Sequence, residues 1–145
     1  MAYLRRTAKS YTAIVPGAGS YVDAAFDSVD EVFDAHQEEA GAITQRTYDE
    51  IQAITRQGDD SLQTAVKVTS VLKRYLIDLH GLGMKAGGNA MSPMWEKYPA
   101  AKEKLDGAFD ELRRLKEQGG PEAKRMFDDA QQQVCVSRLY CCRTS

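Results

Sequence analysis

Residues 21–43 read YVDAAFDSVDEVFDAHQEEAGAI, and the spacing within this stretch decides the fold class. Its apolar residues recur at alternating steps of three and four, which places their side chains on one face of an α-helix. We therefore predict one long amphipathic helix from Tyr21 to Gln57. The residues of this stripe are Val22, Phe26, Val29, Phe33, His36, Ala40 and Ile43, and Ile51 and Ile54 continue it.

A second helix is predicted after the punctuation at residues 58–61, which read Gly-Asp-Asp-Ser. Glycine suits the left-handed conformation at a helix C-terminus, and Asp or Ser can cap the next N-terminus. The predicted helix runs to about His80, and the glycines within residues 81–88 predict a frayed or flexible connection after it. Its apolar stripe includes Leu72, Leu76 and Leu79.

Two further helices are predicted beyond this connection. Ser92-Pro93 marks the start of the third, and Pro99 is expected to separate a one-turn piece from the main helix that begins at Ala100. The buried line of this main helix is Leu105, Phe109, Leu112 and Leu115. Gly119-Gly120 ends it, and Pro121 starts the fourth helix.

A chain of 145 residues has the usual size of one domain, and no stretch of it shows strand alternation. We predict an all-α fold: an antiparallel helical bundle of three to four amphipathic helices with flexible termini. The bundle is expected over residues 18–134. Residues 1–17 are expected to form a basic amphipathic segment or targeting arm, and residues 135–145 a disordered, cysteine-containing tail.

Charge is unevenly distributed along the chain, although the net charge is only −2. Residues 21–60 hold eleven acids against two arginines, whereas residues 61–92 hold four bases against Asp78. An acidic helix beside a basic one favours their docking, although each exposed ion pair contributes only about 0–1 kcal/mol. The near-neutral net charge excludes nucleic acid as a partner bound through a strongly basic surface.

The first fifteen residues combine an apolar helical face with a basic one and contain no acid. This composition is typical of a mitochondrial transit peptide, and it also suits a helix that lies on an anionic membrane surface. An ordinary basic N-terminal helix or arm is the third interpretation. The candidate membrane or targeting face consists of Leu4, Arg5, Arg6, Ala8, Lys9, Tyr11, Ile14 and Val15.

All three cysteines lie near the C-terminus, at Cys135, Cys141 and Cys142. Their odd number, their spacing and the lack of a nearby histidine argue against a disulfide framework or a zinc site. Cys141 and Cys142 lie beside Arg138 and Arg143, which makes them candidates for reversible lipidation.

Residues suited to catalysis are few, since the chain has only two histidines. His36 lies on the apolar stripe of the first predicted helix, where a polar core or interface position explains it. His80 closes the second predicted helix, where a cation is favourable. We therefore predict no catalytic residue, no cofactor and no metal site.

Several short motifs resemble a set of uncharacterised all-helical fungal proteins. The motifs are Tyr21-Val22-Asp23 with Phe26-Asp27, Tyr48-Asp49-Glu50, Tyr98-Pro99 and Gly120-Pro121-Glu122-Ala123-Lys124. The resemblance covers about residues 11–134 and implies a helical protein associated with an organelle or membrane, without a catalytic residue. The charged, proline-punctuated amphipathic helices are also similar in style to those of apolipoproteins.

These patterns favour a non-catalytic helical interaction or scaffold protein that packs its apolar helix faces against another protein or a second copy. The alternative is a protein that binds lipid or a membrane surface reversibly, with a mitochondrial or cytoplasmic location. The candidate helix-packing face consists of Val22, Phe26, Val29, Phe33, Leu72, Leu76, Leu79, Leu105, Phe109 and Leu112.

Overall fold

The structure is a computed structural model that describes residues 2–85 and 93–144, with the backbone alone described for 93–95 and 134–144. The described residues form six α-helices and no strand, so the all-α prediction is confirmed and the predicted count of three to four helices is wrong. The helices are α1 (Ala2–Tyr11), α2 (Ala18–Ala35), α3 (Gln37–Thr55), α4 (Ser61–Lys85), α5 (Pro93–Gln118) and α6 (Gly120–Thr144).

The predicted long helix from Tyr21 to Gln57 is divided at His36 into α2 and α3. His36 leaves the helical conformation, with φ −131° and ψ 52°. Two acidic residues, Glu38 and Glu39, lie in the first turn of α3, where the positive end of the helix dipole favours them. The chain reverses here without a glycine or proline, so the apolar spacing alone gave no sign of the break.

The other helix boundaries follow the predicted punctuation closely, with two differences. Gly58 takes the left-handed conformation after α3 (φ 75°), and the Asp60 carboxylate accepts a hydrogen bond of 2.8 Å from the Gln63 backbone at the start of α4. Helix α4 continues to Lys85, beyond the predicted end, and residues 86–92 of the expected connection lie outside the described residues.

Pro99 does not divide α5, contrary to the prediction, because the helix is continuous from Pro93 to Gln118. Proline removes one backbone hydrogen bond from a helix interior. Tyr98, just before this position, and Ala101, two residues after it, are both buried in the core. Packing on both sides of Pro99 therefore stabilises the helix through the weak point.

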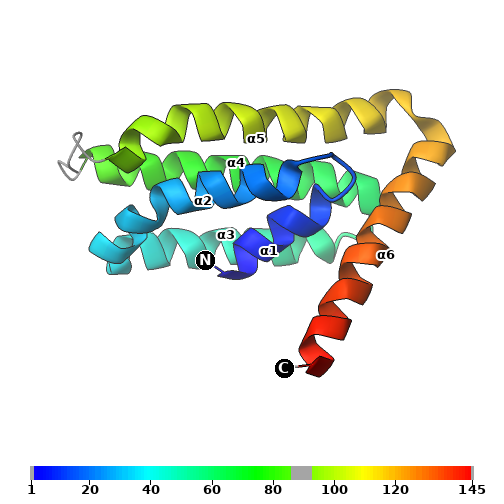
Figure 1. Cartoon of the computed structure of the whole chain (residues 1–145), viewed down its shortest axis with the longest axis horizontal. Helices are drawn as coiled ribbons and strands as arrows, with labels where there is room; N and C mark the ends of the chain where they lie inside the picture. Colours follow the sequence, from blue (N-terminus) through cyan, green and yellow to red (C-terminus); the bar gives the residue numbers. More distant parts are fainter. Residues whose placement is uncertain (1, 86–92, 145) are drawn as a thin grey trace.

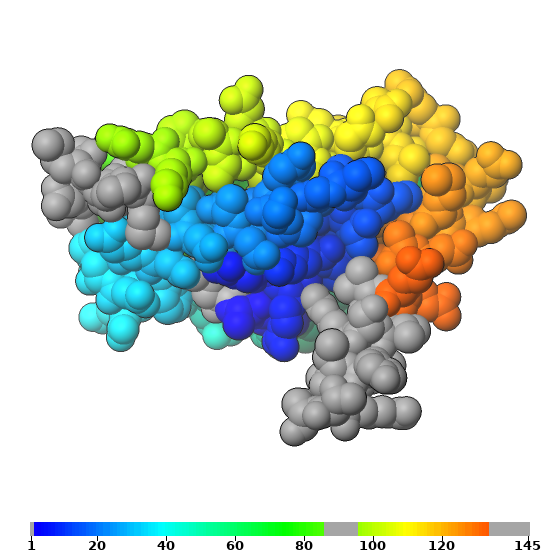
Figure 2. Space-filling view, viewed as in Figure 1, coloured from blue at the N-terminus to red at the C-terminus, as the bar shows by residue number. Residues whose placement is uncertain are grey.

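Helices α2 to α5 run back and forth along the long axis of the molecule, and α6 departs from this direction at the end of α5 (Figure 1). The most extensive helix contacts are those of α2 with α5 and of α3 with α4. Helix α1 contacts α2, α4 and α6, and in the space-filling view it lies against α2 over much of its length (Figure 2).

Buried apolar residues form two clusters. The larger one draws on α1 to α5 and includes Leu4, Phe26 and Tyr75. The smaller one joins α4, α5 and α6 and consists of Leu62, Ala65, Leu112, Ala123 and Phe127. Of the predicted packing face, Val22, Phe26, Val29, Leu72, Leu76, Leu79, Leu105, Phe109 and Leu112 are buried and Phe33 is half-buried.

Both ends of the chain are helical over their described backbone. Helix α1 occupies most of the expected N-terminal arm, and its Leu4 and Ala8 side chains are fully buried. The backbone of α6 is helical to Thr144, across the segment expected to be disordered. The Cys135, Cys141 and Cys142 side chains, and with them the proposed lipidation, lie outside the described side chains.

Candidate functional site

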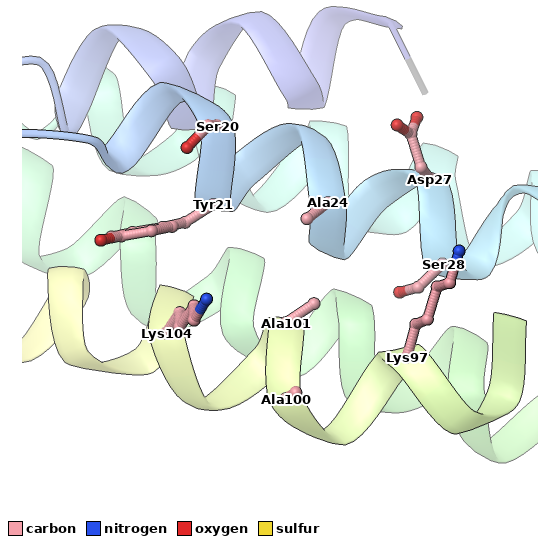
Figure 3. Close-up of a pocket in the computed structure, with 9 residues that line it drawn as sticks. All are labelled: Ser20, Tyr21, Ala24, Asp27, Ser28, Lys97, Ala100, Ala101 and Lys104. Carbon is pink, nitrogen blue, oxygen red and sulfur yellow. The ribbon is translucent and has the colours of Figure 1, made fainter.

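A groove of about 550 Å³ lies between α2 and α5 (Figure 3). Ser28 of α2 and Lys97 and Ala101 of α5 point toward the space between the two helices (Figure 3). The lining residues are Ser20, Tyr21, Ala24, Asp27 and Ser28 from α2, and Lys97, Ala100, Ala101 and Lys104 from α5.

Small side chains create this groove at the most extensive helix contact in the fold. On α2, Ser20, Ala24 and Ser28 are spaced four residues apart, which places them in one row on the helix face. On α5 the groove is lined by Ala100 and Ala101, whose methyl side chains fill little of the space (Figure 3). The row remains open because none of these residues is long enough to cover it.

The groove carries positive charge that the protein itself does not neutralise. Lys97 and Lys104 are exposed and make no ion pair with any described residue. The Lys104 ammonium lies 5.9 Å from the centroid of the Tyr21 ring, which is a cation–π distance. Asp27, which also lines the groove, is paired with Arg5 at 2.9 Å and makes no ion pair with either lysine.

Two hydroxyl groups of the groove already donate hydrogen bonds to nearby backbone carbonyls. The buried Ser28 hydroxyl donates a hydrogen bond of 2.6 Å to the Ala25 carbonyl within α2. The Ser20 hydroxyl likewise donates to the Gly17 carbonyl at 3.0 Å, although Ser20 is exposed. The two lysine ammonium groups are therefore the strongest remaining donors available to a ligand.

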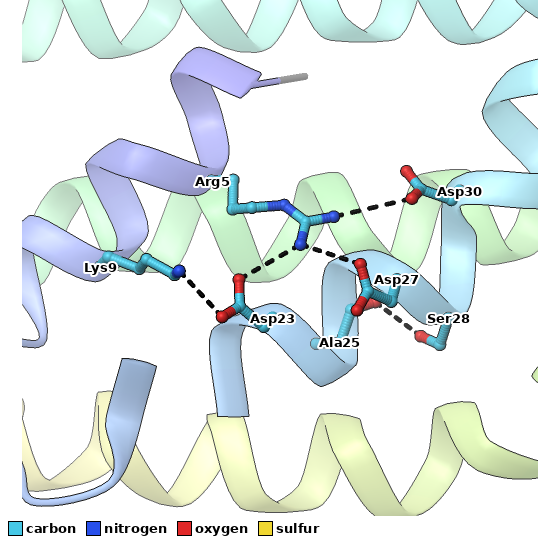
Figure 4. Close-up of polar contacts among 7 residues, drawn as sticks. All are labelled: Arg5, Lys9, Asp23, Ala25, Asp27, Ser28 and Asp30. Atoms are coloured by element: carbon cyan, nitrogen blue, oxygen red, sulfur yellow. Dashed lines mark hydrogen bonds and ion pairs between the residues drawn. The ribbon is translucent and has the colours of Figure 1, made fainter. Parts of the chain in front are cut away.

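A second feature is the ionic contact that docks α1 on α2, which we call the Arg5 network (Figure 4). The Arg5 guanidinium lies 3.2 Å from Asp23, 2.9 Å from Asp27 and 3.7 Å from Asp30. Lys9 pairs with Asp23 at 2.8 Å, and this hydrogen bond lowers the pKa of Asp23. Burial raises the pKa of Asp30.

The apolar side of α1 lies inside the molecule. The predicted targeting face is therefore split: Leu4 and Ala8 are fully buried, whereas Tyr11, Ile14 and Val15 are half-buried. The Tyr11 ring stacks on the Phe127 ring of α6, with centroids 6.5 Å apart. Arg6, the remaining basic residue of this face, is exposed.

A second cavity, of about 600 Å³, lies beside His80 and Tyr98. The two rings stack with centroids 4.0 Å apart, and burial lowers the pKa of His80. Burial also raises the pKa of Tyr98 to about 12. The Tyr98 hydroxyl is buried without a hydrogen-bond partner in the described part of the chain. Since solvent does not reach this hydroxyl, the cavity does not offer it to a ligand.

Within residues 2–85 and 93–144, no group of three His, Cys, Asp or Glu side chains with described positions is placed to hold a metal ion. None of the helices, over their described residues, is both long enough and apolar enough to cross a membrane.

Sequence reasoning missed the groove, although two of its signals are present in the chain. The row of small residues at steps of four on α2 is one, and the Lys97–Lys104 spacing of seven on α5 is the other. Either pattern occurs on many solvated helix faces. Their meaning depends on the two rows facing each other, which only the fold shows.

Comparisons of the chain with known protein families, with curated proteins and with solved structures found no match. The resemblance to fungal helical proteins therefore stays a prediction, and any function rests on the groove and on the Arg5 network.

Proposed function

We propose that the protein is a non-catalytic interaction protein, built on an antiparallel helical bundle, that docks a partner helix in the groove between α2 and α5. The proposed occupant is an acidic amphipathic helix of another protein. The observation that carries this proposal is the pair Lys97 and Lys104, exposed and without ion pairs among the described residues, beside a row of small side chains.

The small side chains meet the steric requirement of helix docking. Axes of packed helices lie about 8–10 Å apart, and the closest approaches need small residues at the contact. Ala24 and Ala100 are exposed in the groove and present little more than a methyl group each. A third helix can therefore approach the backbones of α2 and α5 without displacing a large side chain.

The lysines define which helix the groove should accept. Lys97 and Lys104 are seven residues apart, so they lie on one face of α5 about 10 Å apart along its axis. Acidic residues with the same spacing on a partner helix can reach both ammonium groups. Exposed ion pairs add only about 0–1 kcal/mol each, so the lysines would contribute mainly to selectivity. Apolar contact with the small side chains of the groove would supply most of the affinity.

The experiment is a binding titration with designed peptides of alanine-rich helical sequence. One peptide carries glutamates seven residues apart beside a leucine row, and its counterpart carries lysines at those positions. We expect the acidic peptide to bind the wild-type protein, measured by fluorescence anisotropy, and the K97E/K104E variant to bind it about tenfold more weakly.

Two controls make the result specific to the groove. Lys116 is exposed at the far end of the same helix and does not line the groove, so K116E should bind like the wild type. The K97E/K104E variant should in turn prefer the basic peptide. Equal binding of the acidic peptide by wild type and K97E/K104E would refute the proposal.

A second experiment separates a foreign partner from a second copy of the chain. Sedimentation equilibrium across micromolar concentrations should show a monomer if the groove accepts a foreign helix. A dimer that K97E/K104E abolishes would identify a second copy as the occupant instead, and would replace the proposed partner.

A further inference from the structure

The N-terminal helix combines, on two faces, the features that allow a helix to lie on an anionic membrane. Its acid-free sequence presents Arg5, Arg6 and Lys9, while Leu4 and Ala8 form the side that is buried. A basic amphipathic helix binds such a surface by inserting its apolar face and placing its cations among the lipid headgroups. In the folded chain Leu4 and Ala8 are buried and Arg5 and Lys9 are ion-paired with α2, whereas Arg6 is exposed.

Helix α2 offers α1 a surface with the same chemistry as an anionic lipid layer. Asp23, Asp27 and Asp30 follow one another at steps of four and three, so their carboxylates form a row along one side of α2 (Figure 4). Next to this row, Phe26 belongs to the buried cluster that contains Leu4, and the Arg5 guanidinium lies 5.6 Å from its ring centroid. The row thus substitutes for negatively charged headgroups and the cluster for acyl chains.

The contacts that hold α1 are limited in strength. Only Leu4 and Ala8 of this helix are fully buried, and burial of one leucine contributes about 1.5–3 kcal/mol. The aspartates of the Arg5 network keep 41–63% of their side chains exposed, so their ion pairs are weakened by salt. An anionic membrane stabilises each cation near its surface by about 1 kcal/mol, which is comparable to the energy of one ion pair in the Arg5 network.

The connection to α2 provides a place where the direction of the chain can change. Residues 12–17 lie between the two helices and include Pro16 and Gly17. Gly17 has a φ of 79°, a conformation that glycine adopts readily. Rotation at Gly17 would release α1 together with the buried Thr12 and the half-buried Ile14 and Val15, and would leave the contacts of α2 with α5 in place.

We propose that α1 is an exchangeable membrane-binding helix: it leaves its docking site on α2 to bind an anionic membrane surface, and the Arg5 network holds it back in solution. This inference shares Asp27 with the α2–α5 groove but does not require a partner helix in that groove. It concerns binding at the membrane surface through α1, and it makes the aspartate row of α2 a competitor of anionic lipid for the same cations.

Two variants separate this competition from a general effect of charge. D23N/D27N/D30N removes the competing carboxylates and leaves α1 unchanged, whereas R5E/K9E removes the same ion pairs but also the cations that lipid would bind. We expect the first to bind anionic vesicles about tenfold more strongly than the wild type, and the second to bind more weakly than the wild type.

The measurement is co-sedimentation of the full chain with vesicles of phosphatidylcholine alone or with about one third phosphatidylserine. D34N/E38Q/E39Q is the matched control, because it removes three exposed acids from the end of α2 and the start of α3 without touching the Arg5 network. Thermal unfolding followed by circular dichroism verifies that each variant keeps its helices. D27N, which replaces the most exposed of the three aspartates, gives a milder second variant.

Three outcomes would overturn the proposal. The first is an equal gain in binding by D23N/D27N/D30N and D34N/E38Q/E39Q, which would mean that net charge alone matters. The second is a gain by R5E/K9E, since that variant has lost the cations. The third is absence of binding to anionic vesicles by the wild type, D27N and D23N/D27N/D30N alike.

Discussion

The two terminal helices are attached to the same four-helix body in different ways. Helix α6 is fixed by shape, because Phe127 is fully buried and Gly119 just before the helix allows a close contact that no other residue would permit. Helix α1 is fixed by a small apolar side together with the Arg5 network, whose aspartates keep 41–63% of their side chains exposed. The two meet where Tyr11 stacks on Phe127.

This difference shows which end of the molecule is suited to reversible movement. Contacts made by close packing are nearly insensitive to salt, and a small displacement costs most of their energy. Exposed ion pairs weaken with salt and can be replaced by other anions. The attachment of α6 should therefore behave as part of the core, and that of α1 as a contact that solution conditions can adjust.

Removal of the Phe127 ring should have the largest effect on the attachment of α6. Phe127 is fully buried in the smaller cluster, so Phe127→Ala should lower the free energy of unfolding by about 3–5 kcal/mol, measured by urea denaturation. The neighbouring Met126 is 59% exposed, and Met126→Ala should change it by less than about 0.5 kcal/mol. Similar losses for the two variants would mean that α6 is not attached through Phe127.

A methyl group added at Gly119 tests the fit before α6. The added Cβ would overlap the Ala123 Cβ and lie 2.6 Å from the Leu115 carbonyl oxygen, so Gly119→Ala should destabilise the protein by about 1–3 kcal/mol. Gly107 lies inside α5 and has open space around it. Gly107→Ala should therefore stabilise the protein by about 0.5–1 kcal/mol. Both variants are measured by urea denaturation, and a lower free energy of unfolding for Gly107→Ala would contradict this reasoning.

The glycines, prolines and capping residues of the chain predicted many of the helix boundaries, because such boundaries have local causes. The turn at Gly58 and the cap at Asp60 depend on backbone preferences that a few residues determine. The break at His36 could not be predicted this way. Its surroundings favour a helix on both sides, and the reversal depends on α3 packing against α4.

The candidate sites were predicted less well, since they depend on distant segments. The basic N-terminal face was identified, but its pairing with the acids of α2 was not; the charge pattern suggested docking of the acidic helix on the following basic one. That pairing also exists, for example between Arg74 of α4 and Glu50 of α3. The groove requires the register of α2 against α5, which no local pattern determines.

Salt should distinguish the attachment of α1 from that of α6. Arg5→Gln removes the centre of the Arg5 network and should lower the free energy of unfolding by about 1 kcal/mol at about 0.05 M salt, and by less at about 0.5 M. Phe127→Ala should show the same loss at both concentrations. Arg113→Gln is the matched control, because Arg113 is exposed on α5 and makes no ion pair with a described residue. A salt-independent loss for Arg5→Gln would remove the contrast between the two helices.

The smallest expected effect is the pH dependence of the same contact. The hydrogen bond from Lys9 lowers the pKa of Asp23 in the folded protein. The ionised Asp23 therefore makes its full contribution to the free energy of unfolding above about pH 3.9, the pKa of an unfolded aspartate. The contribution is lost as pH falls through the lower pKa of the folded state. Asp23→Asn should therefore cost a few tenths of a kcal/mol near pH 6, and this cost should be smaller near pH 3, below the pKa of an unfolded aspartate. Asp129→Asn, at an exposed position of α6 without an ion pair to a described residue, should show no such change between the two pH values in urea denaturation. If the cost of Asp23→Asn were the same at both, the Lys9–Asp23 contact would not stabilise the docked state, and α1 would be held by its apolar side alone.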